Sequence, residues 1–236
     1  MNFVNVYGLE KLTMLDYDKH LSAILFYGGC SIRCPYCYNV GIVNKLYDKI
    51  PPEEIINFLK SRVNKLDAIV FSGGECTIHG EALYNDIVYC RNLGYKIKLD
   101  TNGTNYELVK RLINEGLVDY IALDYKCPAC KKELFRFSEA SYFNFNNTLG
   151  ILCDSFVPFE VRTTVHTDII TEEDIMEIIE ELDSKGYSGN YYIQFHFKSA
   201  PETIGNVRQN PRPFNKEKIS GTKKITIKYR NDQDNF

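Results

Sequence analysis

The sequence predicts an α/β fold, a partial (β/α)6 TIM-like barrel, from three observations. Six short apolar runs recur along the chain of 236 residues. Amphipathic helical patterns lie between them, and strands that alternate with helices form βαβ units around a parallel sheet. Polar residues of types that bind ligands or take part in catalysis follow the ends of several runs. Because six strands are too few for a closed eight-stranded barrel, we expect an open sheet of six parallel strands.

The six predicted strands share one composition. Each run is short, rich in Val, Ile, Leu, Tyr or Phe, and bounded by polar residues or glycine, which is typical of a buried strand. In chain order, the predicted strands occupy residues 21–27, 67–71, 96–100, 118–124, 159–165 and 191–196.

The helical patterns carry start and stop signals. Pro51 and Pro52 precede an acidic first turn and an apolar face, which indicates a helix start. Gly94 and Gly116 end two further patterns, and Thr171 is suited to cap a later one. The predicted helices therefore follow Pro52 and occupy residues 81–93, 105–115, 138–153 (the weakest pattern) and 175–184.

Composition and charge narrow the class of protein. A chain of 236 residues suits one domain with at most a small appendage. Its formal net charge of −3 argues against a general nucleic-acid-binding protein. No apolar run approaches the roughly 20 residues that a membrane-spanning helix needs, and residues 1–11 lack the pattern of a signal peptide. We expect a cytoplasmic protein with no nucleic-acid and no membrane partner.

The last forty residues differ from the rest in charge. Residues 197–236 contain nine Lys or Arg and four Asp or Glu, whereas the whole chain is acidic. Within them, residues 224–229 alternate in polarity as a short edge strand does. We predict a core domain at residues 1–200 and a basic C-terminal extension at 201–236.

A cysteine triplet follows the first predicted strand. The chain has eight cysteines, and clustered cysteines in a cytosolic protein more often indicate metal or redox chemistry than disulfides. Cys30, Cys34 and Cys37 are spaced so that their thiolates can hold three irons of a [4Fe–4S] cluster and leave the fourth iron open. A zinc loop or buried free thiols are the alternatives, although zinc sites usually show paired Cys-x2-Cys knuckles.

Further polar motifs follow later strands. Ligands bind at the carboxyl ends of the strands in parallel α/β folds. Because the cysteine triplet and the later motifs all follow strands, they should meet at one edge of the sheet and form an active site there. The later residues at strand ends are Gly73-Gly74-Glu75, Asp100-Thr101-Asn102-Gly103, Asp124-Tyr125-Lys126 and His196.

The triplet, with an aromatic residue before its third cysteine, resembles the signature of the radical S-adenosylmethionine (SAM) superfamily. Gly73-Gly74-Glu75 is similar to the motif of that family that contacts the amino group of SAM. The resemblance implies that the open iron binds SAM, and that an electron cleaves SAM to a 5′-deoxyadenosyl radical. It also implies a barrel of the radical SAM type, with Tyr36 near the adenine.

Three motifs resemble a narrower group, the activating enzymes of glycyl-radical enzymes. They are Cys37-Tyr38-Asn39, Asp100-Thr101-Asn102-Gly103 and Asp124-Tyr125-Lys126. The resemblance implies that a monovalent cation beside SAM is held by Asp100, Thr101, Asp124 and the carbonyl of Ala122. It places Arg162 and His196, by looser matches, near the carboxylate and ribose of SAM.

Residues 8–17 (GLEKLTMLDY) resemble the opening of activating proteins of anaerobic ribonucleoside-triphosphate reductase. The resemblance implies an enzyme that removes a hydrogen atom from one glycine of a partner glycyl-radical enzyme, with anaerobic ribonucleotide reductase as the expected partner. A flavodoxin- or ferredoxin-like protein is the expected reductant. Two alternatives stay open: a radical SAM enzyme that modifies a peptide or nucleoside, and a non-catalytic iron–sulfur protein for electron transfer.

A second cysteine pair follows Lys126. Cys127 and Cys130 have the Cys-x2-Cys spacing of half a zinc knuckle or of a redox pair. They are possible auxiliary thiols, and the alternative is a pair of unligated thiols.

Overall fold

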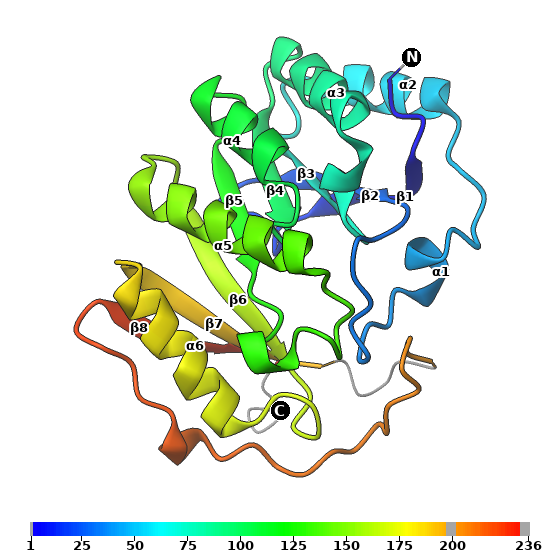
Figure 1. Cartoon of the computed structure of the whole chain (residues 1–236). Helices are drawn as coiled ribbons and strands as arrows, with labels where there is room; N and C mark the ends of the chain where they lie inside the picture. The colour runs from blue at the N-terminus through cyan, green and yellow to red at the C-terminus, as the bar shows by residue number, and fades with distance from the viewer. Residues whose placement is uncertain (1, 197–201, 232–236) are drawn as a thin grey trace.

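A computed structural model describes residues 2–196 and 202–231. Within them, eight strands form one sheet in the order of the sequence (Figure 1). β1 is antiparallel to β2, and all later neighbours are parallel. The strands are β1 (Val6–Thr13), β2 (Ser22–Tyr27), β3 (Ala68–Gly73), β4 (Lys96–Thr101), β5 (Tyr120–Asp124), β6 (Phe159–Val165), β7 (Gly189–Phe195) and β8 (Ile225–Arg230).

Helices connect successive parallel strands and cover the outer face of the sheet (Figure 1). Ser138 and Thr171 cap the last two of them through their side chains. The main helices are α2 (Pro52–Arg62), α3 (Glu81–Asn92), α4 (Tyr106–Asn114), α5 (Glu139–Asp154) and α6 (Glu172–Ser184). Shorter turns of helix are α1 (Val40–Val43), η1 (Cys76–His79), η2 (Ala129–Lys131) and η3 (Lys216–Lys218).

The predicted fold class is confirmed: the sheet is open, and its helices lie as in a partial TIM-like barrel. All six predicted strands and five predicted helices are present. The strand number differs, because an edge strand stands on each side of the predicted six. β8 matches the alternation at residues 224–229, whereas β1 was not predicted. β1 contains a glycine and three exposed residues, so it lacks the apolar run of a buried strand.

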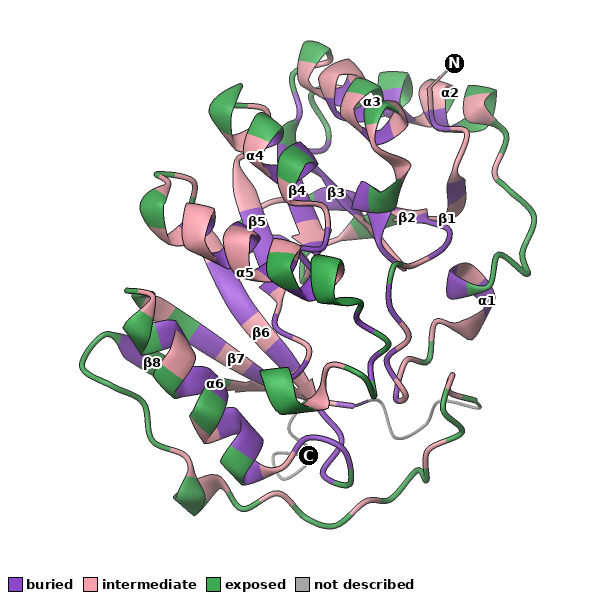
Figure 2. Ribbon diagram, viewed as in Figure 1, coloured by how far each residue is buried: buried purple, intermediate pink, exposed green. Residues whose placement is uncertain are grey.

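The two faces of the sheet differ in chemistry. Apolar side chains such as Ile97 and Leu99 belong to the main core between the sheet and the helices. Figure 2 shows that the central strands are largely buried. Side chains alternate along a strand, so the intervening Lys98 and Asp100 project from the other, inner face. A small apolar cluster that includes Tyr17 lies on that face, and much of the remainder is charged. The inner face therefore offers a polar site inside an otherwise apolar protein.

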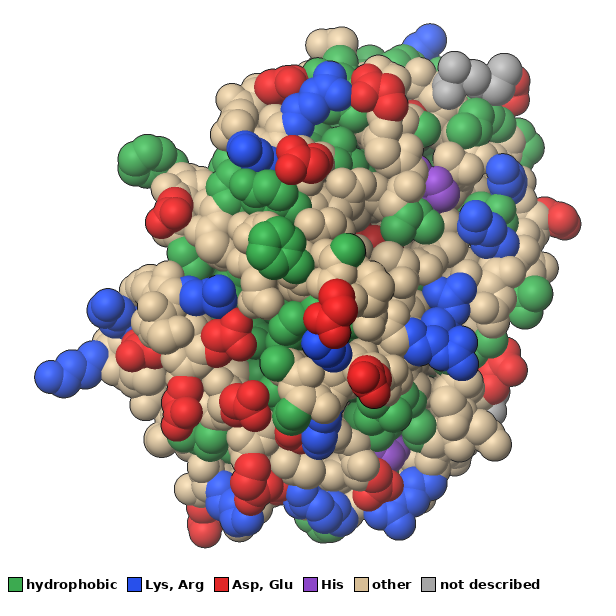
Figure 3. All heavy atoms as spheres, in the orientation of Figure 1, with side chains coloured by type: hydrophobic (Ala, Val, Ile, Leu, Met, Phe, Trp, Pro, Cys, Tyr) green, Lys and Arg blue, Asp and Glu red, His purple; other side chains and the backbone are tan. Residues whose placement is uncertain are grey.

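Residues 202–224 run past the carboxyl ends of β6 and β7 before β8 begins (Figure 1). Their basic side chains pair with acidic partners: Arg212 with Glu172, Arg208 with Asp168, and Lys218 with Glu173. Figure 3 shows basic and acidic side chains interleaved along this lower edge. Inside the barrel, Arg230 of β8 donates two hydrogen bonds of 2.8 Å to Glu160. The domain boundary predicted at residues 200 and 201 falls in part outside the described residues.

Candidate functional site

A cavity of about 420 Å³ opens at the carboxyl ends of the strands. Its volume lies in the range of small-molecule sites, roughly 300–1,000 Å³. Most of the predicted site residues line it: Cys30, Cys34, Tyr36, Cys37, Gly73, Gly74, Asp100, Asp124, Arg162 and His196. Glu75 and Thr101 are buried beside this wall. The parallel register explains the convergence, because it sets Tyr27 beside Gly73 and Asp124 beside Arg162.

The loop that carries the three cysteines is fixed by contacts from three directions. Glu75 N donates to the Gly29 carbonyl at 2.9 Å, and Arg33 N donates to the Phe135 carbonyl at 2.9 Å. From the tail, Ile204 N donates to the Cys37 carbonyl at 3.0 Å. The loop that follows β3, the loop before α5 and the tail thus position the cysteines together.

Gly73 and Gly74 are required by close backbone approach. Gly73 has φ +127°, and a Cβ there would lie 2.3 Å from backbone atoms of Tyr27. A Cβ on Gly74 would lie 2.0 Å from the Gly29 oxygen. Glycine therefore lets the loop after β3 lie directly against the start of the cysteine loop.

The three thiols line one cavity and lie close to a half-buried lysine, Lys126. Burial, with the charge of Glu75, raises the pKa of Cys30 to about 11. Burial also raises the pKa of Cys34 and of Cys37, and Lys126 opposes the rise for all three. Iron binding needs thiolates, and Lys126 is a cation placed to favour them.

The three cysteines fit a cubane cluster as a ligand set. In such a cluster each thiolate binds a different iron, so the sulfurs need not converge on one point. Among residues 2–196 and 202–231, no three His, Cys, Asp or Glu side chains gather closely enough for a single metal ion.

The Glu75 carboxylate is directed into the protein. It accepts hydrogen bonds from Thr77 (N at 3.2 Å, Oγ1 at 2.6 Å), from Thr101 Oγ1 at 2.8 Å and from Asn102 N at 2.6 Å. Burial raises its pKa, and these donors partly offset the rise. Glu75 thus ties the loop after β3 to the loop after β4. The SAM contact implied for it by the resemblance stays a prediction.

Asn102 is a site residue for which the sequence motifs predict no individual role. It lines the cavity, and its Nδ2 lies 3.8 Å from Cys30 Sγ and 3.1 Å from Ser31 Oγ. Its Oδ1 accepts from Thr104 N and Oγ1, which fixes the orientation of the amide. Its place in the motif Asp100-Thr101-Asn102-Gly103, at the end of a predicted strand, indicated that it lies near the site. Its contact with Cys30 depends on tertiary structure.

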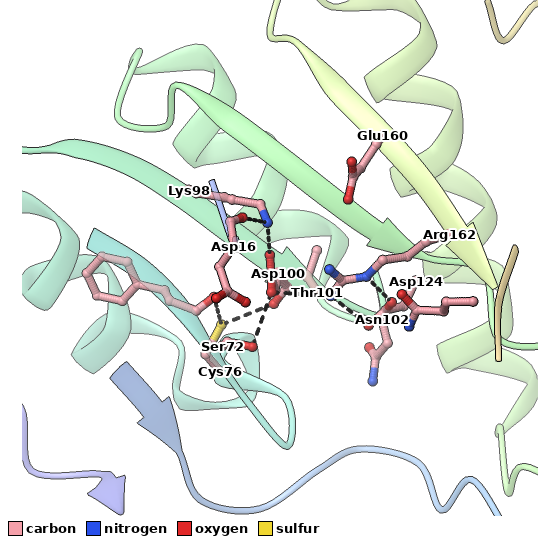
Figure 4. Close-up of polar contacts among 12 residues, drawn as sticks. Asp16, Ser72, Cys76, Lys98, Asp100, Thr101, Asn102, Asp124, Glu160 and Arg162 are labelled. Atoms are coloured by element: carbon pink, nitrogen blue, oxygen red, sulfur yellow. Dashed lines mark hydrogen bonds and ion pairs between the residues drawn. The ribbon is translucent and has the colours of Figure 1, made fainter. Parts of the chain in front are cut away.

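A chain of alternating charges crosses the cavity wall (Figure 4). Arg162 bridges two carboxylates: its Nε lies 2.6 Å from Asp124 Oδ1, and its Nη2 lies 3.3 Å from Asp100 Oδ2. Lys126 Nζ lies 3.0 Å from Asp124 Oδ2, and Lys98 Nζ lies 3.1 Å from Asp100 Oδ1.

Burial alone would raise the pKa of the Asp100 and Asp124 carboxyls, but the neighbouring cationic side chains have the larger, opposite effect. Arg162 and Lys126 lower the pKa of Asp124 to about 2, and Arg162 and Lys98 lower that of Asp100. Both carboxylates are thus ionised at neutral pH. Burial would lower the pKa of Lys126, yet Asp124 raises it above its usual range.

His196 lines the cavity and lies beside His166, with ring centroids 4.5 Å apart. His196 Nε2 is 3.2 Å from the Gln209 carbonyl, and His166 Nε2 is 2.8 Å from the Arg208 carbonyl. The two imidazoles thus contact the backbone of the tail.

The second cysteine pair lies next to the site. Cys127 is buried and Cys130 is exposed, and both are free thiols. Burial, with the charge of Cys130, raises the pKa of Cys127 to about 12. An auxiliary role for this pair stays a prediction.

Comparisons with known proteins agree with this geometry. A family profile described as the Radical SAM superfamily matches residues 24–193. A curated protein of Methanocaldococcus jannaschii, provisionally named a glycyl-radical enzyme activating enzyme, is 38% identical over 177 residues, which are 73% of each chain. The pyruvate formate-lyase-activating enzyme of Clostridium pasteurianum is 28% identical over 133 residues, which are 52% of this chain and 56% of that protein.

Solved structures share the fold. SuiB of Streptococcus suis, solved with bound S-adenosylmethionine, aligns with a TM-score of 0.58 at 14% identity. The alignment covers 80% of this chain and 45% of SuiB, so the chain spans about half the length of that structure. No helix among the described residues is long and apolar enough to cross a bilayer.

Proposed function

Because this chain belongs to the radical SAM superfamily, we propose that it is an activating enzyme for a glycyl-radical enzyme. Membership of the family implies a [4Fe–4S] cluster and SAM as cofactors. When bound, the cluster supplies the electron that cleaves SAM to methionine and a 5′-deoxyadenosyl radical. The observation that carries the proposal is one cavity lined by the three cysteines, Gly73-Gly74 and the Arg162–Asp124–Lys126 chain.

In the proposed site, different residues of the chain bind the cluster and the separate groups of SAM. Cys30, Cys34 and Cys37 would hold the cluster, and Lys126 offsets negative charge beside them. Arg162 and His196 line the same cavity as this loop, and a carboxylate and a ribose of SAM would bind beside them. Gly73 and Gly74 line the same cavity, where the amino group would bind. The reaction would move one hydrogen atom from a glycine Cα to the 5′-deoxyadenosyl radical, which gives 5′-deoxyadenosine and a glycyl radical.

A protein substrate needs access to this cavity. The sheet does not close, because β1 and β8 are both edges, and the cavity opens at the carboxyl ends of the strands. The name of the M. jannaschii relative supports a glycyl-radical enzyme as the partner. The resemblance of residues 8–17 supports anaerobic ribonucleotide reductase in particular. A flavodoxin- or ferredoxin-like protein is the proposed electron donor.

Release of 5′-deoxyadenosine separates the proposed enzyme from an electron-transfer protein. The reconstituted, dithionite-reduced protein should convert SAM to 5′-deoxyadenosine and methionine. An intact cluster without SAM cleavage would contradict the enzymatic function. An electron paramagnetic resonance signal of a glycyl radical after mixing with anaerobic ribonucleotide reductase would then identify the partner. SAM cleavage with no such signal would favour the alternative substrates, a peptide or a nucleoside.

Replacement of Asn102 by alanine should shift the cluster's midpoint potential to a more negative value. Hydrogen bonds to cluster sulfurs stabilise the reduced, more negative state, and the Asn102 amide lies 3.8 Å from Cys30 Sγ. A redox titration followed by electron paramagnetic resonance measures the shift. Asn105→Ala is the control, since Asn105 caps α4 and bonds the Thr77 carbonyl. Equal potentials in wild type and Asn102→Ala would refute the assigned contact.

A further inference from the structure

Lys98 is a buried ammonium group that the proposed reaction does not use. It lies two residues before Asp100 on β4, so both side chains project from the inner face. Its side chain is 5% exposed. Its Nζ lies 3.1 Å from Asp100 Oδ1, donates to the Asp16 carbonyl, and lies 5.9 Å from the centroid of the Tyr120 ring (Figure 4). A lysine buried to this degree requires compensation, and these contacts supply it.

All four oxygens of Asp100 and Asp124 contact cationic nitrogens of the chain. Asp100 meets Lys98 through Oδ1 and Arg162 through Oδ2. Asp124 meets Arg162 through Oδ1 and Lys126 through Oδ2. Three cationic side chains therefore surround two carboxylates. This group of five charged side chains carries a net positive charge before any ion is added.

The Thr101 hydroxyl is also engaged. It donates to Glu75 Oε1 at 2.8 Å and accepts from Gly103 N at 3.0 Å. Each side-chain oxygen that the family resemblance assigns to a monovalent cation thus contacts a cationic nitrogen or a hydrogen-bond partner, although Asp100 Oδ1 has only its ion pair with Lys98 and makes no hydrogen bond. An added cation would meet three like charges at short range. These residues do not fit a bound K⁺ or Na⁺.

We propose that Lys98, together with Arg162 and Lys126, takes the place of the monovalent cation, so that this site works without K⁺ or Na⁺. Lys98 is the distinguishing residue, because it neutralises Asp100 from the side of the barrel interior, away from the cysteine loop. The inference depends on the family resemblance for the expected place of the ion. Its stability test is independent of SAM cleavage and of the partner, so it can fail while the proposed function stands.

The test compares thermal unfolding of the full chain in KCl, NaCl and choline chloride at equal ionic strength. A cation present at a hundredfold excess over its dissociation constant would raise the midpoint by roughly 5–10 °C. We expect the same midpoint for the wild type in all three salts. Lys98→Met removes the ammonium group and should create a midpoint that rises with K⁺ or Na⁺ and saturates. Lys96→Met changes an exposed lysine of the same strand and is the control.

Two results would overturn the proposal. One is a saturable stabilisation of the wild type by K⁺ or Na⁺ relative to choline. The other is a Lys98→Met variant that folds and remains as insensitive to the salts as the wild type. If Lys98→Met does not fold, Lys98→Arg keeps the charge and should show the same midpoint in all three salts. A cation-dependent midpoint in Lys98→Arg would contradict the proposal, because the charge alone would then not replace the ion.

Discussion

Replacement of Cys34 by serine should abolish cluster binding and SAM cleavage together. Cys34 is buried at the centre of the triplet, and its backbone carbonyl accepts from Cys37 N at 3.0 Å. Serine has nearly the same shape but provides no thiolate, so one iron of the proposed cluster loses its ligand. The iron content after reconstitution and the yield of 5′-deoxyadenosine should both fall to background. Cys30→Ser and Cys37→Ser should behave in the same way.

Cys153→Ser is the matched control for this experiment. Cys153 is a half-buried thiol on α5, away from the cavity wall. Its replacement should leave iron content and SAM cleavage at wild-type levels, and circular dichroism should show that all the variants are folded. A Cys34→Ser protein that retains a full cluster would contradict the proposed ligand set.

Replacement of Gly74 by alanine should have the second-largest effect. The new Cβ would lie 2.0 Å from the Gly29 oxygen and 3.3 Å from Cys30 Cβ. The first of these atoms is backbone and cannot swing aside, so the cysteine loop or the loop after β3 must move. Overpacking of this kind costs about 1–3 kcal/mol. Because Cys30 directly follows Gly29, we expect a greater loss of SAM cleavage than of stability.

Gly150→Ala tests whether this effect is local. Gly150 is in α5, and a Cβ there meets nothing within 4 Å. Alanine should stabilise that helix by about 0.5–1 kcal/mol and leave SAM cleavage unchanged. Thermal unfolding and 5′-deoxyadenosine yield measure both variants. Wild-type SAM cleavage by Gly74→Ala would show that the close approach of the two loops is not required.

The parts of the fold that the sequence predicts are those fixed by local pattern. Continuous apolar runs bounded by polar residues identify the buried parallel strands, since both faces of such strands are covered. β1 escaped prediction because Gly8, Glu10 and Lys11 interrupt its pattern at an exposed edge. The signal for β8 was its alternation, which is typical of an edge strand.

The site also contains residues that a local sequence pattern predicts and contacts that only the tertiary structure creates. Residues at strand ends, such as the three cysteines and Asp124, could be placed at one edge because parallel strands end together. The contact of Asn102 with Cys30 joins loops 72 residues apart in sequence, and no local pattern encodes it. The pairing of Arg212 with Glu172 likewise depends on where the tail lies. The position of Lys98 beside Asp100 could be predicted, because residues two apart on a strand project from the same face of the sheet.

In the proposed function, the site removes a hydrogen atom from a glycine of a partner protein. The most direct measurement uses anaerobic ribonucleotide reductase made with α-deuterated glycine, in ordinary water, with SAM and dithionite. The mass of the released 5′-deoxyadenosine is then determined. We predict 5′-deoxyadenosine that carries one deuterium, and unlabelled product from partner made with ordinary glycine. Release of only unlabelled 5′-deoxyadenosine in the presence of the deuterated partner would contradict the proposed function.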